Sequence, residues 1–417
     1  MKVDVLVVGA GPAGLAAAIA IKESGIDNLV VIERENEAGG ILRQCIHNGF
    51  GLHRFKEELT GPEYAEKDVK KAAEMGIDIR LNTTVLSVTD DKTVTCISRE
   101  RGIETFECRA VVLCMGCRER PRGALGTPGT RCAGIFSAGT AQKFVNLMGL
   151  MPGKEIVILG SGDIGLIMAR RMTLQGAKVK ACIEIMPYSS GLNRNIVQCL
   201  EDYDIPLYLS HTVTDIKGRE RLESITVSKV DENRQPISGS EFEIPCDTLL
   251  LSVGLIPENE LTLGAGIALA PQTGGAVVDD NFETEIPGIF TAGNVLHVHD
   301  LVDHVSDEST RAGRAAALYV LNGQAEKATL CILDGQGVRG AVPQKIHPEG
   351  EGDVRIMFRP DRVYENAEIR VQSGDTLLKN RKARILTPGE MAEIVVSRAA
   401  FQGINEPVTI SVSEASK

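Results

Sequence analysis

Two copies of one glycine-rich pattern lie about one domain apart in this chain of 417 residues. Each copy follows an apolar run typical of a strand and opens an apolar run typical of a helix. An acidic residue, Glu33 or Glu184, follows nineteen positions after the last glycine of each copy. A strand, a glycine turn, a helix and an acid at this spacing are typical of a dinucleotide-binding βαβ unit, so we expect two dinucleotides to bind. The glycines are Gly9, Gly11 and Gly14 in the first copy and Gly160, Gly162 and Gly165 in the second.

The chemistry of a dinucleotide explains these residue types. The first glycine makes a tight turn, the second lets backbone N–H groups approach the pyrophosphate, and the third lets helix and strand pack closely. The N-terminus of the helix offers unpaired N–H groups to the phosphates. A carboxylate at the acidic position accepts hydrogen bonds from ribose hydroxyls and repels a 2′-phosphate. Because Ile185, Met186 and Pro187 follow Glu184 without an arginine, the second site favours NAD over NADP.

Composition narrows the class of protein. The net charge of −11 and the absence of tryptophan disfavour a nucleic-acid surface, and the charge also disfavours a polybasic membrane patch. No apolar run approaches the roughly 20 residues of a membrane span, and Met1 leads almost directly into the first strand without a secretory signal. Ten scattered cysteines indicate reduced thiols. We therefore expect a cytoplasmic enzyme that binds no nucleic acid and does not span the membrane.

The order of elements suggests a duplication. A βαβ unit over residues 3–35 is repeated over 154–185, and the later strands follow a similar order in both halves. A helix is predicted over Pro62–Met75, and a loop rich in Pro, Gly and Arg over 118–128 indicates a domain crossing. From about residue 326, apolar residues alternate with polar ones, which predicts a small all-β domain. The strands are expected at 78–88, 93–99, 104–108 and 110–116, and at 207–215, 222–230, 240–244 and 248–254.

Further motifs accompany the fingerprints: Glu33-Arg34 followed by Gly39-Gly40, the strand end Cys-Met-Gly at 114–116, and the run from Thr284 to Asn294. With them, residues 1–325 resemble the two-dinucleotide flavoproteins, a group that includes thioredoxin reductase and the pyridine nucleotide-disulfide oxidoreductases. The resemblance implies an α/β fold with two Rossmann-like domains and the cofactors FAD and NAD(H). It places the FAD-binding domain at 1–118 and 246–325, the NAD-binding domain at 119–245, and a C-terminal β domain, a possible partner interface, at 326–417.

The resemblance also implies which residues contact the cofactors. For FAD these are Gly9, Gly11, Pro12, Ala13, Gly14, Glu33, Arg34, Gly40, Ile41, Asn48, Val85, Met115, Gly116, Gly293 and Asn294. For NAD they are Gly160, Gly162, Asp163, Ile164, Gly165, Glu184 and Gly254. A helix is expected after Asn294, beginning in the segment 296–304, and its N-terminus should point at the flavin.

Longer stretches, such as GSGDIGLIMARR and GNVLHVHDLVD, resemble one branch of this group. Its members are bacterial FAD-dependent oxidoreductases associated with glycerol-3-phosphate dehydrogenase, and more distantly the α-subunits of sarcosine, opine and cyanide-forming amine oxidases. This resemblance implies a partner flavoprotein dehydrogenase subunit, in a glycerol-3-phosphate or amine oxidation system. It leaves open whether the assembly is a homo- or a hetero-oligomer.

Two features depart from the group. Asn294 stands where the family carries aspartate, and the redox cysteine pair of the disulfide reductases is missing. Cys45 follows the Gly-Gly loop without a second cysteine, and the one C-x-x-C, Cys114 to Cys117, lies at a strand end. Residues three apart on a strand point to opposite faces, so buried structural thiols are favoured over a redox pair.

No catalytic base can be assigned from the sequence; His47, His299 and Cys45 are weak candidates. The segment 296–304 holds three histidines and two aspartates, yet we expect no metal, because in the family this place is occupied by flavin. The favoured function is an NADH oxidoreductase that exchanges electrons with a partner flavoprotein or small acceptor. A non-catalytic nucleotide-binding subunit is the alternative, and a thiol-disulfide reductase is the third.

Overall fold

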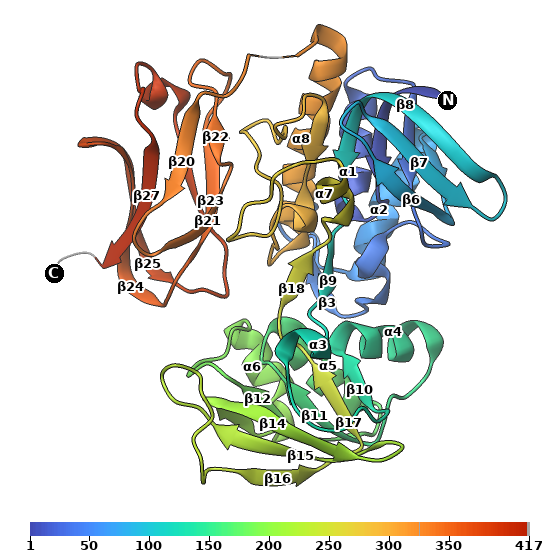
Figure 1. Ribbon diagram of the computed structural model, residues 1–417, viewed down its shortest axis with the longest axis vertical. Helices are drawn as coiled ribbons and strands as arrows, with labels where there is room; N and C mark the ends of the chain where they lie inside the picture. Colours follow the sequence, from blue (N-terminus) through green and yellow to red (C-terminus); the bar gives the residue numbers. More distant parts are fainter. Residues whose placement is uncertain (325, 415–417) are drawn as a thin grey trace. The chain divides into compact units, whose positions relative to one another are not determined.

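The computed structural model describes residues 1–324 and 326–414. The chain forms two compact units, the first made of Met1–Cys117 and Pro257–Lys417 and the second of Arg118–Ile256 (Figure 1). Among the described residues, no helix combines the length and apolar character needed to cross a membrane.

The first unit contains a Rossmann-like sheet with the order β5-β2-β1-β8-β7-β6, and β19 pairs with β8. Helices α1 and α8 pack side by side (Figure 1) because Gly313 of α8 lies against α1; a Cβ on Gly313 would be 2.4 Å from the backbone oxygen of Ala17. The elements of this part are β1 (Lys2–Val8), α1 (Pro12–Glu23), β2 (Leu29–Ile32), α2 (Gly61–Glu74), β5 (Asp78–Arg80), β6 (Thr83–Val88), β7 (Thr93–Ser98), β8 (Gly102–Leu113), α7 (Glu260–Gly264), β19 (Ile289–Thr291) and α8 (Val302–Asn322). Strands β9 (Cys117–Glu119) and β18 (Leu255–Pro257) pair with each other, and each crosses a boundary between the units in the sequence.

Strand β8 is continuous where the sequence predicted two strands, 104–108 and 110–116. Its first half pairs antiparallel with β7 and alternates between exposed and buried residues. From Ala110 to Leu113 it is buried on both faces and lies between β1 and β19, both parallel to it. The change of neighbours changes the hydrophobic period within one strand, which explains the wrong prediction.

Two other predicted strands are each divided in two. The run 78–88 is interrupted at Asn82, and the run 207–215 at Ser210; both residues have positive φ, 51° and 55°. A single left-handed residue turns the chain without leaving a long loop. The predicted helix over Pro62–Met75 is confirmed as α2, with a capping box between Thr60 and Glu63 at its start.

The second unit repeats the plan with a five-stranded parallel sheet, order β10-β17-β11-β12-β13, and a three-stranded antiparallel sheet, order β14-β15-β16. Its elements are α3 (Arg122–Leu125), β10 (Ile135–Ser137), α4 (Ala138–Met148), β11 (Glu155–Leu159), α5 (Asp163–Leu174), β12 (Lys178–Glu184), α6 (Asn193–Cys199), β13 (Leu207–Leu209), β14 (His211–Gly218), β15 (Leu222–Lys229), β16 (Phe242–Pro245) and β17 (Thr248–Leu251).

The predicted return to the first domain at residue 246 comes too early. Strand β17 is wholly buried and lies between β10 and β11, so it completes the parallel sheet of the second unit. It corresponds to β8, which lies beside β1 in the first unit. Residues 246–256 therefore belong to the second unit, and so does Arg118, which was predicted to lie in the first.

The C-terminal part of the first unit is an all-β domain around its own core. Its sheets have the orders β22-β20-β27-β24-β25 and β21-β23-β26, and pairing is antiparallel except between β20 and β27. The predicted alternation is present except at one position: Val354, Ile356 and Phe358 are buried and Arg355 and Arg359 are partly exposed. Met357, predicted to alternate with the buried residues, is itself buried. The strands are β20 (Leu330–Asp334), β21 (Val338–Val342), β22 (Lys345–Ile346), β23 (Val354–Pro360), β24 (Tyr364–Ser373), β25 (Thr376–Leu386), β26 (Ala392–Val396) and β27 (Val408–Glu414).

Candidate nucleotide-binding sites

The first fingerprint forms a tight turn between β1 and α1. Gly9 has φ of 101°, and a Cβ there would be 2.5 Å from the backbone oxygen of Cys114. A Cβ on Gly14 would be 1.7 Å from the oxygen of Gly9. A Cβ on the middle glycine, Gly11, would have its nearest described neighbour, the Cα of Gly40, at 3.9 Å. The protein itself thus requires the outer glycines, while the middle glycine borders free space.

The second fingerprint has the same geometry in the second unit. Gly160 also has φ of 101°, and a Cβ there would be 2.0 Å from the oxygen of Ser252. A Cβ on Gly165 would be 2.5 Å from the oxygen of Gly160, whereas one on Gly162 has its nearest described neighbour, Ser190 Oγ, at 3.6 Å. In both loops the middle glycine is the helix N-cap and carries no side chain to cap the first N–H groups. Each loop therefore leaves a backbone surface that a pyrophosphate can approach.

The two acidic residues also occupy equivalent positions. The carboxylate of Glu33 accepts hydrogen bonds from the N–H groups of Ala10, at 2.7 Å, and Glu35, at 2.9 Å. The carboxylate of Glu184 accepts from the N–H of Ser161 and of Met186, both at 2.9 Å, and from Ser161 Oγ at 2.6 Å. Both side chains are buried, and a carboxylate has about four acceptor sites, so each can still accept from a ribose hydroxyl. The residues present fit a dinucleotide in each unit.

The other residues expected at the second site have structural partners. Asp163 Oδ1 accepts from the N–H of Leu192 at 2.8 Å and from Asn195 Nδ2 at 2.7 Å, which ties the helix start to the loop after β12. Ile164 packs against the core of the second unit. Gly254 has φ of 97° and accepts a hydrogen bond from the N–H of Arg120.

The Gly-Gly loop lies against the first fingerprint. The N–H of Gly39 donates to the oxygen of Ala10 at 2.8 Å, and a Cβ on Gly40 would be 2.9 Å from the Cα of Gly11. After it, the short 3-10 helix η1 (Gly40–Gln44) leaves Ile41 60% exposed. This arrangement brings the predicted FAD residues Gly11, Gly40 and Ile41 to one place. Of the other predictions, Arg34 is exposed, while Val85 and Met115 pack against the core of the sheet.

The loop with Asn48 is held from two helices. Asp303 of α8 accepts from the N–H of Gly51 and of Arg54, at 3.2 and 2.7 Å. The Arg54 guanidinium pairs with the buried Asp68 of α2 at 2.5 and 2.9 Å. Asn48 begins β3 (Asn48–Phe50), which pairs with β4 (Leu59–Thr60), and its side chain is exposed. A rigid support therefore presents Asn48 to solvent.

Two of the weak catalytic candidates lie in this loop. His47 Nδ1 is 3.1 Å from the oxygen of Asn48, and its ring packs against Phe50. Cys45 Sγ donates to the oxygen of Ile41 at 3.4 Å, and burial raises the pKa of the thiol to about 12. A thiol with that pKa stays protonated at neutral pH, so Cys45 is a poor nucleophile.

The helix expected after Asn294 begins near the end of the predicted segment 296–304. Gly293–Val295 form one 3-10 turn, and α8 starts only at Val302. The intervening loop is tied to the C-terminal domain: Asp300 pairs with Arg359 and accepts from the N–H of Met391 at 2.5 Å. These long-range bonds draw the segment out of a helical path, which the sequence could not show.

Asn294 is part of this loop. Its Oδ1 accepts from the N–H of His299 at 3.0 Å, and its Nδ2 donates to Cys117 Sγ at 3.5 Å. The neighbouring Gly293 has φ of 77°, and a Cβ there would be 2.8 Å from the Cβ of Ala13 in α1. The loop that carries Gly293 and Asn294 therefore touches the first helix of the fingerprint.

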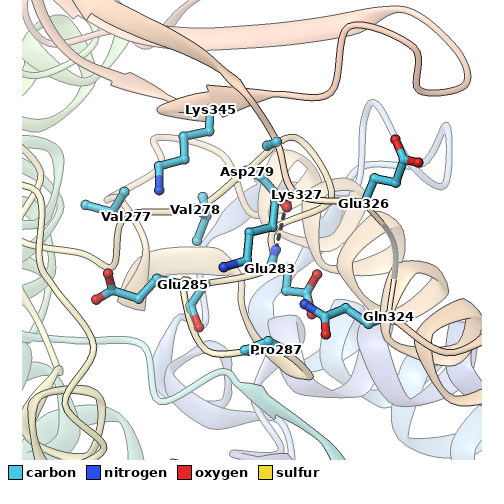
Figure 2. A pocket seen from close by; sticks show the side chains of 12 residues that line it. Val277, Val278, Asp279, Glu283, Glu285, Pro287, Gln324, Glu326, Lys327 and Lys345 are labelled. Atoms are coloured by element: carbon cyan, nitrogen blue, oxygen red, sulfur yellow. Dashed lines mark hydrogen bonds between the residues drawn. The ribbon is translucent and has the colours of Figure 1, made fainter.

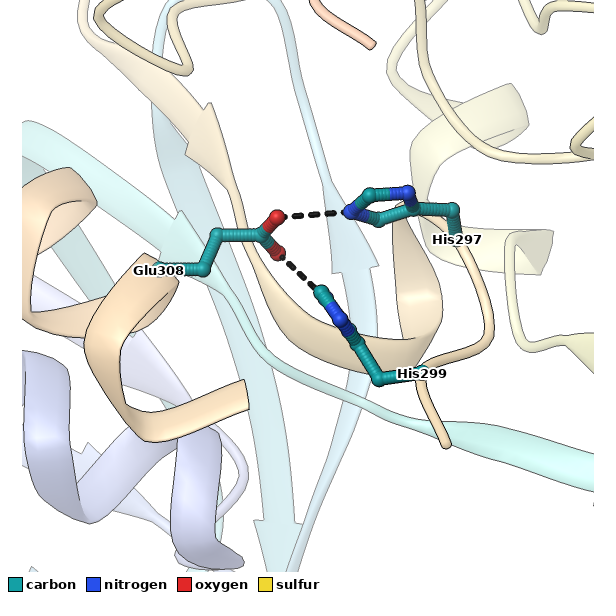
Figure 3. Close-up of side chains that lie close together, drawn as sticks. All are labelled: His297, His299 and Glu308. Carbon is teal, nitrogen blue, oxygen red and sulfur yellow. Dashed lines mark hydrogen bonds and ion pairs between the residues drawn. The ribbon is translucent and has the colours of Figure 1, made fainter. Parts of the chain in front are cut away.

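The histidines and aspartates of the segment 296–304 do not form one cluster. Asp300 and Asp303 have the partners described above, and the ring of His304 lies 6.0 Å from that of His53. His297 and His299 instead lie beside Glu308 of α8, a residue that sequence reasoning missed (Figure 3). A signal was present: Glu308 falls on the stripe of α8 that also carries Val305, Ala312 and Ala316, and a carboxylate on a buried stripe needs partners.

The C-x-x-C does not form a disulfide, and none of the ten cysteines is bridged to another described residue. Cys114 is buried beside the fingerprint turn, and burial raises the pKa of its thiol. Cys114 therefore lacks the environment that activates a redox thiol, namely a lowered pKa at a helix N-terminus.

A separate polar cavity of about 110 Å³ lies at residues 277–287, beside Gln324 and Lys327 and the start of the C-terminal domain (Figure 2). Asp279, Glu283 and Lys345 line it, and none of its lining residues belongs to a fingerprint. Burial raises the pKa of Asp279 to about 7. Its neighbour Asp280 pairs with His347 Nδ1 at 2.6 Å and with Arg398 Nη1 at 2.5 Å, so this region joins the C-terminal domain to the sheet domain.

Comparison with known proteins identifies the family of this chain. Residues 3–344 match the family model described as pyridine nucleotide-disulphide oxidoreductase, and the chain belongs to this family. The family consists of FAD-dependent NAD(P)H oxidoreductases, which confirms the expected class of enzyme and its cofactors, FAD and a nicotinamide dinucleotide. Most of the C-terminal domain lies beyond the match.

Individual relatives are more distant. Hydrogen cyanide synthase subunit HcnB of Pseudomonas protegens is 24% identical over 77% of this chain and 71% of the relative. An opine oxidase subunit of Agrobacterium tumefaciens is 27% identical over 76% of this chain and 65% of the relative. Thioredoxin reductase of Listeria innocua is 28% identical over 76% of this chain and 93% of the relative. The crystal structure of thioredoxin reductase from T. acidophilum confirms the fold. It aligns with a TM-score of 0.64 and 24% identity, over 77% of this chain and 99% of that one.

Proposed function

We propose that the chain transfers hydride between NAD(H) and FAD and passes the electrons to a partner flavoprotein or a small acceptor. When bound, the flavin and nicotinamide supply the hydride chemistry, and the protein orients them. The observation that carries the proposal is the pair of fingerprint turns with open middle glycines and matched carboxylates, Glu33 and Glu184. A disulfide relay is disfavoured because Cys114 is buried as a thiol.

The two sites are assigned different cofactors. FAD is placed in the first unit, where the Gly39–Gly40 loop and the Gly293–Asn294 loop both touch the fingerprint helix or turn. NAD(H) is placed in the second unit. NAD is favoured over NADP because Glu184 repels a 2′-phosphate and its carboxylate is held in place by Ser161 and Met186.

Measuring flavin reduction with both dinucleotides tests the assignment of NAD. We expect NADH to give a kcat/KM at least about 10-fold above that for NADPH, the equivalent of roughly 1.4 kcal/mol. Equal values, or a preference for NADPH, would contradict the role given to Glu184.

The partner is proposed from the relatives. Two of them are named as subunits, of hydrogen cyanide synthase and of opine oxidase, and a third, 27% identical, is the glutamate synthase small chain of Escherichia coli. We propose that this chain likewise works with a second flavoprotein subunit, in a glycerol-3-phosphate or amine oxidation system, and that the C-terminal domain serves as the interface. The ten cysteines without a disulfide fit a reducing, cytoplasmic compartment.

Anaerobic addition of NADH to the purified, FAD-loaded protein separates the proposal from a non-catalytic subunit. Rapid bleaching of the flavin absorbance is expected. A flavin that stays oxidised while NADH is shown to bind would identify a subunit that only holds nucleotides.

The thiol reductase alternative has its own test. Cys114→Ser should leave flavin reduction and turnover with an artificial acceptor unchanged, because the thiol is a buried neighbour of the turn. Loss of turnover with normal FAD content would instead favour a thiol relay through Cys114 and Cys117.

A further inference from the structure

Two histidines and one glutamate form a buried cluster beside the Gly293–Asn294 loop (Figure 3). His297 and His299 come from the loop before α8, and Glu308 from its second turn. His297 Nε2 is 2.6 Å from Glu308 Oε2, and His299 Nε2 is 3.2 Å from Oε1. The side chains are 4%, 0% and 1% exposed, so the three groups meet away from bulk water.

Hydrogen bonds alone leave this cluster poorly satisfied. His297 donates from Nε2, but its Nδ1 has no hydrogen-bond partner among the described residues. Neither ring nitrogen of His299 has one, although Nε2 lies close to a carboxylate oxygen. A buried polar atom without a partner costs about 1–3 kcal/mol. The Nδ1 atom of each ring is therefore a buried nitrogen without a hydrogen-bond partner among the described residues, while both Nε2 atoms face the Glu308 carboxylate.

We infer that His297, His299 and Glu308 bind a divalent transition-metal ion. Two imidazoles and one carboxylate are a donor set suited to Zn²⁺ or Fe²⁺. In a tetrahedral site, bonds of about 2.0–2.2 Å place neighbouring ligand atoms roughly 3.3–3.6 Å apart. The 3.2 Å contact of His299 is close to that spacing, and the 2.6 Å contact of His297 has to lengthen when an ion binds. The inference does not depend on the proposed function.

The surroundings support a positioned site. The N–H of Gly293 donates to Glu308 Oε1 at 2.8 Å and orients the carboxylate, as an outer hydrogen bond does around bound metals. The two histidine rings lie 4.3 Å apart at an angle of 66°, and both present Nε2 to Glu308. The three protein ligands leave at least one coordination position for water.

The sequence predicted no metal because flavin occupies this place in the family, and the residues it grouped are not those that meet in the fold. It offered Asp300, Asp303 and His304 as neighbours of the two histidines, but these have other partners in the fold. The structure supplies Glu308 instead, and places the cluster in the core below the Gly293–Asn294 loop.

Metal content of the full chain tests the inference. The FAD-loaded protein, prepared without a histidine tag and dialysed against metal-free buffer, is analysed by plasma mass spectrometry. We expect about one equivalent of zinc or iron per chain. His299→Ala and Glu308→Gln should lose at least about nine-tenths of it, whereas His304→Ala, a nearby histidine outside the cluster, should retain it.

A second measurement covers variants that fail to fold. The wild-type chain is stripped with a chelator, and Zn²⁺ alone is added back in competition with a chromophoric chelator. One tight site, with a rise in Tm on addition, supports the inference. A wild-type chain that carries less than about a tenth of an equivalent and binds no Zn²⁺ would overturn it, and so would equal metal content in all variants.

Discussion

Replacing Gly162 by alanine should abolish tight dinucleotide binding without unfolding the second unit. Gly162 has φ of −68° and ψ of 165°, a conformation open to alanine, and its Cβ would have 3.6 Å to the nearest described atom. The gain from a less flexible unfolded chain, about 0.4–1 kcal/mol, roughly offsets the poorer helix cap. We expect the free energy of unfolding to change by less than about 0.5 kcal/mol.

Binding should respond very differently. The added methyl occupies the surface over which backbone N–H groups approach the pyrophosphate. Loss of one hydrogen bond to a charged group costs about 1.5–3 kcal/mol, which raises the Kd for NADH roughly 10- to 100-fold. FAD content should be unchanged, because Gly11 in the other unit is intact.

Gly160→Ala is the matched control. Its Cβ would lie 2.0 Å from the oxygen of Ser252, on a residue with φ of 101°. The strain should cost at least about 2 kcal/mol of stability and lower Tm. Anaerobic stopped-flow titration with NADH gives the Kd, and urea unfolding gives the stability. If Gly162→Ala bound NADH like the wild type, or unfolded like Gly160→Ala, the assignment of the middle glycine would be refuted.

Three further predictions concern the first unit. Arg54→Met leaves the carboxylate of Asp68, which is 3% exposed, without its cation, so it should destabilise the chain by about 3–5 kcal/mol in thermal unfolding. The double variant with Asp68→Leu should recover most of this stability. A double variant as unstable as Arg54→Met would contradict the ion-pair argument. Burial raises the pKa of Asp279 to about 7 from 3.8, so its contribution to stability is complete below pH 4 and is lost as pH rises through 7. The stability of Asp279→Asn relative to the wild type should therefore rise between about pH 4 and pH 7 in urea unfolding, by up to about 1.4 kcal/mol per pKa unit. A difference that stays constant with pH would argue against the raised pKa. Asn294→Leu removes both the acceptor for His299 N–H and the donor to Cys117, so its FAD content should fall. Asn294→Asp keeps the acceptor and should retain more FAD than Asn294→Leu. Equal FAD content in the two variants would show that the side chain is not needed.

Much of the fold could be predicted because its signals are local. The spacing of glycines and the acids Glu33 and Glu184 predicted both βαβ units, since a tight turn and a close helix allow few other residues. Period-two alternation predicted the C-terminal β domain. These signals depend on residues within a few positions of each other, so they can be recognised without knowing which distant residues pack against them.

The errors concern elements whose neighbours come from far along the chain. Strand β8 changes neighbours at its middle, and β17 joins the sheet of the second unit, so neither follows from its own pattern. The delayed start of α8 depends on Arg359 and Met391, which bind Asp300 from the C-terminal domain. Long-range pairing decides such cases, because a strand or loop of the same sequence can satisfy its hydrogen bonds in several ways.

The sequence by itself determined the two dinucleotide turns and indicated the family, and it favoured buried structural thiols over a redox pair. Only the tertiary structure decided which groups lie next to each other. It leaves free space around Gly11 and Gly162. It pairs Asp300 and Asp303 with structural hydrogen-bond partners and places Glu308 beside His297 and His299. The physical reason is that a backbone conformation is set by nearby residues, whereas a buried charge or imidazole is satisfied by whichever group folding brings within about 3 Å.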